Sequence, residues 1–176
     1  MTMDAAARRA LAADVDAAAR LTGTFVLRSG ATASEYFDKY RFEADPRLLS
    51  RVAAAMVPLV PSEVEVLAGV ELGGVPIATA MSLASGLPAA FVRKQAKTYG
   101  TRLAVEGGDL TGKQVAIIED VISTGGAVRD AKARLDEAGA ITVAVVCAVW
   151  RGPLPARIEG LEVPVLSALT LEDLNG

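Results

Sequence analysis

The sequence contains no histidine and only one cysteine, Cys147, among its 176 residues. The lack of histidine excludes catalytic triads built on that residue, histidine metal sites and imidazole acid–base catalysis. A single cysteine excludes an intramolecular disulfide and a multi-cysteine zinc site. Cys147 stands in an apolar, strand-like run, so we expect it to be a buried bystander.

Long hydrophobic runs and an excess of positive charge are also absent. The longest apolar runs, 52–60 and 143–150, are too short to span a bilayer. The first residues lack the basic-then-apolar order of a signal peptide. We therefore expect a cytoplasmic protein that makes no membrane contact. The formal net charge of −3 gives no basic field for a nucleic-acid backbone, so we expect no nucleic-acid partner.

The chain does have the material for one folded domain. Hydrophobic residues make up 52% of the sequence, and a domain of this length buries about 70% of the surface that its unfolded chain exposes. Strand-like and helix-like segments alternate from residue 64 onward, and the strand-like segments are apolar throughout. This pattern predicts an α/β fold whose mostly parallel sheet is covered by helices on both faces.

The expected elements follow from periodicity and from helix start and stop signals. We expect helices over residues 4–21, from the Asp45-Pro46 start to Pro58, and over 77–83 and 128–138. We expect strands over 64–70, 89–92, 114–118, 141–149 and 163–166, with further strands and turns over 24–42. Residues 93–113 fit no period, and a connection of about 20 residues without structure is either functional or disordered.

The most informative stretch runs from Val115 to Ala127. An apolar strand leads to two adjacent carboxylates, Glu119 and Asp120, followed by a hydroxyl- and glycine-rich turn and a helix. Such a turn offers an anion backbone N–H groups and a positive helix N-terminus, at the sheet edge where ligands bind. A phosphorylated sugar suits this arrangement, because the acids can accept hydrogen bonds from its ring hydroxyls. A plain helix cap explains the turn, but it does not explain two acids whose mutual repulsion costs stability.

The whole motif resembles the signature of type I phosphoribosyltransferases. The resemblance implies that family's fold, with a central, mostly parallel β-sheet flanked by helices. It also implies a single domain, 1–176, with a small hood formed by about 1–45 and the C-terminal segment. Glu119 and Asp120 would hold the ribose hydroxyls of 5-phosphoribosyl 1-pyrophosphate. The residues implied to bind its 5′-phosphate are Ser123, Thr124, Gly125, Gly126 and Ala127, and Val121 and Ile122 are also implied to contact this substrate.

Two more segments resemble orotate phosphoribosyltransferases in particular. Residues 23–38 are similar to the hood segment, which implies that Arg28, Tyr36 and Phe37 line the orotate pocket. Ordinary core packing is the alternative for the two aromatic rings. Residues 69–78 resemble the pyrophosphate loop, in which Leu72 and Gly73 would offer backbone N–H groups to the leaving group.

Residues 91–101 resemble the mobile catalytic loop of the same family. The residues implied to clamp pyrophosphate are Arg93, Lys94, Lys97 and Tyr99, and Lys97 joins Glu119 and Asp120 as a catalytic residue. The alternative for the three cations is a solvated face. Tyr99 stands where the family commonly has histidine. The resemblance also implies a homodimer in which the loop of residues 93–113 completes the partner's site.

Arg151 and Ser123 complete the implied orotate site, although Trp150 departs from the aspartate that the family often has before this arginine. The implied reaction transfers the 5-phosphoribosyl group to orotate, giving orotidine 5′-monophosphate and pyrophosphate in pyrimidine biosynthesis. The implied cofactor is Mg²⁺, held mainly by pyrophosphate and water with no direct protein ligand. Two alternatives remain: an enzyme for another nucleobase such as a purine, and a non-catalytic regulator that senses phosphoribosyl pyrophosphate.

Overall fold

The computed structural model describes residues 3–26, 29–95 and 103–176. The predicted site residues Arg28, Lys97 and Tyr99 therefore lie outside the described residues. No helix in the described part of the chain has both the length and the apolar composition needed to cross a membrane.

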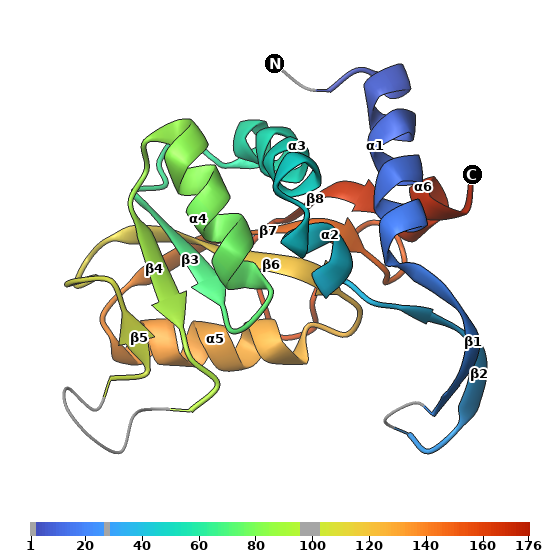
Figure 1. The fold of residues 1–176 in the computed structure, drawn as a ribbon. Helices are drawn as coiled ribbons and strands as arrows, with labels where there is room; N and C mark the ends of the chain where they lie inside the picture. The colour runs from blue at the N-terminus through green and yellow to red at the C-terminus, as the bar shows by residue number, and fades with distance from the viewer. Residues whose placement is uncertain (1–2, 27–28, 96–102) are drawn as a thin grey trace.

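A six-stranded sheet with the order β5-β4-β3-β6-β7-β8 forms the centre of the protein (Figure 1). Its strands are β3 (Val66–Val70), β4 (Ala89–Val92), β5 (Val105–Glu106), β6 (Gln114–Ile122), β7 (Ile141–Trp150) and β8 (Val165–Thr170). All neighbouring strands are parallel except β4 and β5. Helices α3 (Pro46–Met56) and α4 (Gly74–Ser85) cover one face, and α5 (Gly126–Glu137) covers the other. The predicted architecture is confirmed.

The central strands send side chains into two cores. On β6, Ala116 and Ile118 join the core under α3 and α4, whereas Val115 and Ile117 join the core under α5. All four are completely buried. Burial on both faces is why these strands are apolar throughout. Burying one isoleucine or valine fully stabilises the fold by about 1.5–3 kcal/mol.

The first residues form a separate layer beside this sheet. Its elements are α1 (Ala5–Ala19), β1 (Arg20–Val26), β2 (Thr32–Phe37) and α2 (Tyr40–Ala44). The β1–β2 hairpin projects away from the sheet, and the N-terminal helix lies beside the C-terminal α6 (Leu171–Asn175) (Figure 1). An ion pair of 2.6 Å between Arg8 Nη2 and Asp173 Oδ2 joins α1 to α6.

Several boundaries agree with the sequence and several do not. The predicted start of α3 is confirmed, because the Asp45 side chain accepts hydrogen bonds from the backbone N–H groups of Arg47 and Leu48. The extended structure predicted up to residue 42 is wrong at its end, where α2 forms and buries Phe42 completely in the core. The short strand β5 and the terminal helix α6 were not predicted, and a 3-10 turn, Val57–Leu59, follows α3.

Candidate active site

The two adjacent acids of the signature lie within β6. The strand was predicted to end before them, but it continues to Ile122 because Val121 and Ile122 pair with Val149 and Trp150 of β7. Successive side chains of a strand leave opposite faces, but the Glu119 and Asp120 carboxyl groups still interact with each other. Glu119 is 7% exposed and Asp120 is 0% exposed. The expectation that both stand at the end of the strand is wrong, because the strand continues past them.

Glu119 lines a cavity of about 200 Å³ at the N-terminus of α5. The cavity is lined by Glu119 and by residues 121–128, which include the whole predicted phosphate turn. Gly125 precedes α5 with a φ of +74°, and a Cβ there would lie 2.5 Å from Ile158 Cγ2, so a side chain would be both strained and crowded. The turn thus keeps its backbone open at a helix N-terminus, an arrangement that suits an anion.

The Asp120 carboxylate lies beside Lys39 at the start of α2 and Gly73 at the start of α4. Its Oδ2 lies 2.7 Å from the Lys39 ammonium, and its Oδ1 lies 3.0 Å from the same nitrogen. A Cβ on Gly73 would lie 1.6 Å from Asp120 Oδ2. The carboxylate therefore occupies the space that any side chain at residue 73 would need, and it lies directly under the predicted pyrophosphate loop.

The predicted pyrophosphate loop joins β3 to α4. Gly73 is the N-cap of α4, and Leu72 is 60% exposed. The peptide bond between Glu71 and Leu72 is cis. Gly74 packs so closely on β6 that a Cβ would lie 2.3 Å from the Ile118 carbonyl oxygen. This close packing holds the loop against the strand that carries the two acids.

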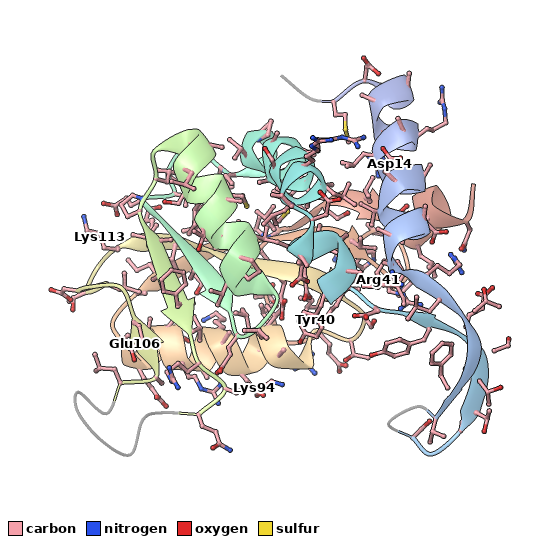
Figure 2. The ribbon with its side chains drawn as sticks, in the orientation of Figure 1. Asp14, Tyr40, Arg41, Lys94, Glu106 and Lys113 are labelled. Carbon is pink, nitrogen blue, oxygen red and sulfur yellow. The ribbon has the colours of Figure 1, made fainter. Side chains whose placement is uncertain are left out.

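The described root of the predicted catalytic loop is tied to its neighbours. The Lys94 N–H donates to Glu71 Oε2 at 2.7 Å, and the Lys94 carbonyl accepts from Arg134 Nη2 of α5 at 2.5 Å. The Arg93 N–H donates to the Ala104 carbonyl at 2.8 Å. Lys94 lies just beyond the end of β4, near α5 (Figure 2). The loop therefore leaves the sheet beside both the pyrophosphate loop and α5.

The structure brings two predicted orotate residues together. The Arg151 guanidinium carbon lies 5.6 Å from the centroid of the Phe37 ring. The Arg151 N–H donates to the Ile122 carbonyl at 2.8 Å, which places this corner beside the phosphate turn. Tyr36 is 47% exposed and packs on Phe25 with ring centroids 5.6 Å apart. Core packing therefore does not account for Tyr36.

Trp150 and Cys147 are both buried in the structure. Trp150, which departs from the family pattern, is 2% exposed and its indole N–H donates to the Pro153 carbonyl at 2.9 Å. It supports the turn that follows Arg151. Cys147 is buried as expected, and burial raises the pKa of its thiol. Among residues 3–26, 29–95 and 103–176, no three histidine, cysteine or carboxylate side chains are grouped as for a metal ion.

Comparison with known proteins agrees with this arrangement. A family model described as "Phosphoribosyl transferase domain" matches residues 41–167. The orotate phosphoribosyltransferase of a Nocardioides species is 57% identical over 98% of this chain and 96% of that protein. The chain belongs to the orotate phosphoribosyltransferase family.

Solved structures of this family have the same fold. Orotate phosphoribosyltransferase of Mycobacterium tuberculosis, in complex with Fe(III) dicitrate, has a TM-score of 0.86 and 31% identity, covering 97% of this chain and 99% of that one. The same enzyme in complex with 5-phospho-α-D-ribosyl 1-diphosphate has a TM-score of 0.79 and 28% identity with the same coverage. Both likenesses extend over nearly the whole chain, so they include the N-terminal layer as well as the sheet.

Two residues that the sequence did not indicate lie close to Asp120 of the signature in the folded protein. Lys39 and Glu43 come from α2 and its N-cap, and both approach Asp120, which lies 81 residues further along the chain than Lys39. The only signal for them in the sequence is that both are charged residues close to Phe42. Glu43 is 7% exposed, and a buried carboxyl group with a perturbed pKa is a signal of function.

Burial and mutual repulsion dominate the acid–base properties of this cluster. Burial, reinforced by the neighbouring Asp120, raises the pKa of Glu119 to about 8. Burial and a hydrogen bond with Asp120 raise the pKa of Glu43 to about 9. The nearby Lys39 acts in the opposite direction on both. At neutral pH, Glu43 and Glu119 therefore favour the protonated, neutral form when no ligand is bound.

The raised pKa values predict a stability that falls with pH. Between the ordinary glutamate pKa of about 4.3 and the raised values, the folded state keeps protons that the unfolded chain has released. Each such group lowers the free energy of unfolding by at most about 1.4 kcal/mol per pH unit in that window. We expect the Tm of the ligand-free protein to fall from pH 5 to 8, and to fall less in Glu43→Gln. Exposed Glu137→Gln is the control, and a wild-type Tm that rises over this range would contradict the prediction.

Proposed function

We propose that this protein transfers the 5-phosphoribosyl group from 5-phosphoribosyl 1-pyrophosphate to orotate, giving orotidine 5′-monophosphate and pyrophosphate. One observation carries the proposal: a single strand, β6, presents Glu119 to the phosphate-turn cavity and Asp120 to the pyrophosphate loop. Substrate bound beside these two acids would have its 5′-phosphate at the phosphate turn and its leaving group at the pyrophosphate loop. The 57% identical relative carries the name of this activity.

The phosphoribosyl group needs orientation more than it needs a protein nucleophile. The expected transition state resembles an oxocarbenium ion with negative charge growing on pyrophosphate, as in glycoside cleavage. In our proposal, residues 121–127 hold the 5′-phosphate at the N-terminus of α5, and Glu119 and Asp120 accept hydrogen bonds from the ribose. Binding would draw Glu119 toward its ionised form, because the ribose hydroxyls donate to carboxylates. Fixing both ends of the sugar aligns C1 with the attacking base.

The leaving group is stabilised by the loops on the other side of Asp120. Backbone N–H groups of Leu72 and Gly73 would bind pyrophosphate, and Arg93, Lys94 and Lys97 would neutralise its growing charge. Tyr99 can donate one hydrogen bond there but carries no charge at neutral pH. Closure of this loop over the site would exclude water and strengthen these interactions. The tie between the Lys94 N–H and Glu71 supports this role, because it joins the two loops at their roots.

Mg²⁺ fits the site as a cation that arrives with the substrate. The Glu119 carboxyl group at the cavity is an oxygen donor, the type of ligand that Mg²⁺ prefers, and Mg²⁺ keeps much of its water and commonly binds phosphates. When bound, it would neutralise charge on pyrophosphate. The family's use of Mg²⁺, and a cytoplasmic location, remain proposals for this chain.

Orotate is a planar anion, and the corner near Phe37 matches both properties. Arg151 would pair with its carboxylate, Phe37 and Tyr36 would pack on the ring, and Arg28 and Ser123 would complete the site. The contact between Arg151 and Phe37 supports this placement, because it puts a charge beside an apolar ring. A ring nitrogen of orotate then attacks C1 of the ribose.

A panel of nucleobases tests the choice of substrate. Orotate, adenine, hypoxanthine, guanine and uracil are each supplied with phosphoribosyl pyrophosphate and Mg²⁺, and product nucleotide is measured. We expect kcat/KM for orotate to exceed that for every other base by at least about a thousandfold, since a site built for a charged group rejects molecules that lack it. A purine used as well as orotate would replace the proposal with its alternative.

Arg151→Ala tests the orotate corner directly. We expect the KM for orotate to rise much more than the KM for phosphoribosyl pyrophosphate, because only orotate contacts this side chain. Removing one partner of a charge pair on a bound ligand typically costs about 2–5 kcal/mol. Steady-state kinetics with each substrate varied in turn gives both values. Equal increases in both KM values would mean that Arg151 contacts the sugar phosphate or supports the fold, and does not bind orotate specifically.

A further inference from the structure

Lys39 makes an ion pair that no motif of the chain indicated. Its ammonium lies 2.7 Å from Asp120 Oδ2 and 3.0 Å from Oδ1, so it contacts both oxygens. The Asp120 side chain is completely buried, whereas the Lys39 side chain is 34% exposed. Lys39 therefore reaches from the start of α2 into the protein and places its charge on a carboxylate of β6.

The surroundings of Asp120 explain why a cation is needed there. Glu43 and Glu119 both interact with Asp120, and the raised pKa of each is partly due to the Asp120 charge. Three carboxyl groups thus share one buried cluster. Two neighbouring carboxylates in such a cluster repel each other, and one of them then tends to become neutral. Lys39 is the cation that pairs with the Asp120 carboxylate in this cluster.

We propose that Lys39 is a positioning residue for the phosphoribosyl pyrophosphate site, which fixes the Asp120 carboxylate under the pyrophosphate loop. The inference rests on the proposed function. It goes beyond it by assigning a role to a residue outside the signature and both loops. Lys39 acts through Asp120, and the effect reaches the loop because Asp120 Oδ2 fills the space beside Gly73.

The effect of removing Lys39 should be confined to one substrate. Without the ammonium, the Asp120 carboxylate loses the partner that fixes its position, and it moves within the cluster. This movement alters the contact with Gly73 and the position of the group that accepts the ribose hydroxyls. Orotate is expected to bind near Arg151 and Phe37, on another part of the site, so its KM should not change.

Lys39→Met is the test, with Lys132→Met as the matched control. Lys132 is 31% exposed and lies 2.7 Å from Asp136 Oδ2, so it offers a similar ion pair on the surface of α5. Binding of phosphoribosyl pyrophosphate with Mg²⁺ is measured by calorimetry, and both KM values by steady-state kinetics. We expect Lys39→Met to bind this substrate at least about tenfold more weakly, a change of about 1.4 kcal/mol. The KM for orotate should stay within about twofold, and Lys39→Arg should recover part of the loss.

A double variant separates action through Asp120 from direct contact with substrate. If Lys39 acts through Asp120, Lys39→Met should weaken binding much less in the Asp120→Asn background than in the wild type. Equal effects in both backgrounds would overturn the proposal, as would a folded Lys39→Met that binds like Lys132→Met. If Lys39→Met does not fold, Lys39→Gln is judged by the same criteria. Failure of the wild type itself to bind phosphoribosyl pyrophosphate would instead contradict the proposed function.

Discussion

Asp120→Asn should lower kcat/KM by at least about a hundredfold, equivalent to roughly 2.7 kcal/mol of transition-state stabilisation. The substitution keeps the shape of the side chain but removes the carboxylate. In our proposal this carboxylate accepts hydrogen bonds from the ribose hydroxyls, and its Oδ2 lies 2.7 Å from the Lys39 ammonium. Steady-state rates with both substrates varied give the value. Activity within threefold of the wild type would show that Asp120 is not part of the catalytic site.

The stability of this variant needs its own measurement, because Asp120 lies inside the protein and not at its surface. It is completely buried and its partner Lys39 is about one-third exposed. Breaking a fully buried pair costs about 3–5 kcal/mol, and the exposure of Lys39 to water reduces that cost. We therefore expect a lower Tm with the fold retained. Asp136→Asn, which removes a surface partner of Lys132, should change neither Tm nor activity appreciably.

Mixing two inactive variants should restore roughly a quarter of wild-type activity if the protein is a homodimer whose loops act across the interface. The variants are Lys97→Ala and Asp120→Asn, purified separately and then allowed to exchange subunits. Random exchange makes about half of the dimers mixed, and one site in each mixed dimer then has both an intact Asp120 and an intact Lys97. The other site carries both changes and stays inactive.

The alternative results are equally clear. If the loop serves its own subunit, every site keeps one change and mixing restores nothing. A monomeric mass in solution, or no recovery after exchange has been verified, would assign Lys97 to its own chain. Part of the segment 93–113 belongs to its own subunit, because Val105 and Leu110 are buried in the core under α5. The proposal therefore depends on the cation-bearing part of the segment.

The parts of the fold that depend on local signals were predictable from the sequence. Apolar runs identified β3, β4 and β7, and the Asp45-Pro46 pair identified the start of α3. The length of β6 was not predictable in this way, because charged residues at 119 and 120 normally end a buried strand. Pairing with β7 up to Trp150 extends it. Likewise, α2 forms because Phe42 is buried in the core, a tertiary effect that periodicity does not reveal.

The candidate site also has parts that the sequence predicted and parts that it did not. The phosphate turn was predictable as a turn, since its hydroxyls and glycines are contiguous; in the structure residues 121–128 and Glu119 line one cavity. The family resemblance assigned Arg151 and Phe37 to one site, and the two side chains lie together in the structure. Lys39 and Glu43 were not predictable, because they meet Asp120 only through folding. Their sequence context gives no motif that would distinguish them from surface charges.

Release of pyrophosphate tests the central claim most directly. The wild-type protein is mixed with phosphoribosyl pyrophosphate, orotate and Mg²⁺, and pyrophosphate and orotidine 5′-monophosphate are measured together. We predict that the two products appear in equal amounts, and that omission of orotate or Mg²⁺ abolishes both. A correctly folded protein that binds phosphoribosyl pyrophosphate but releases no pyrophosphate with orotate would contradict the claim and identify a sensor of this sugar phosphate instead.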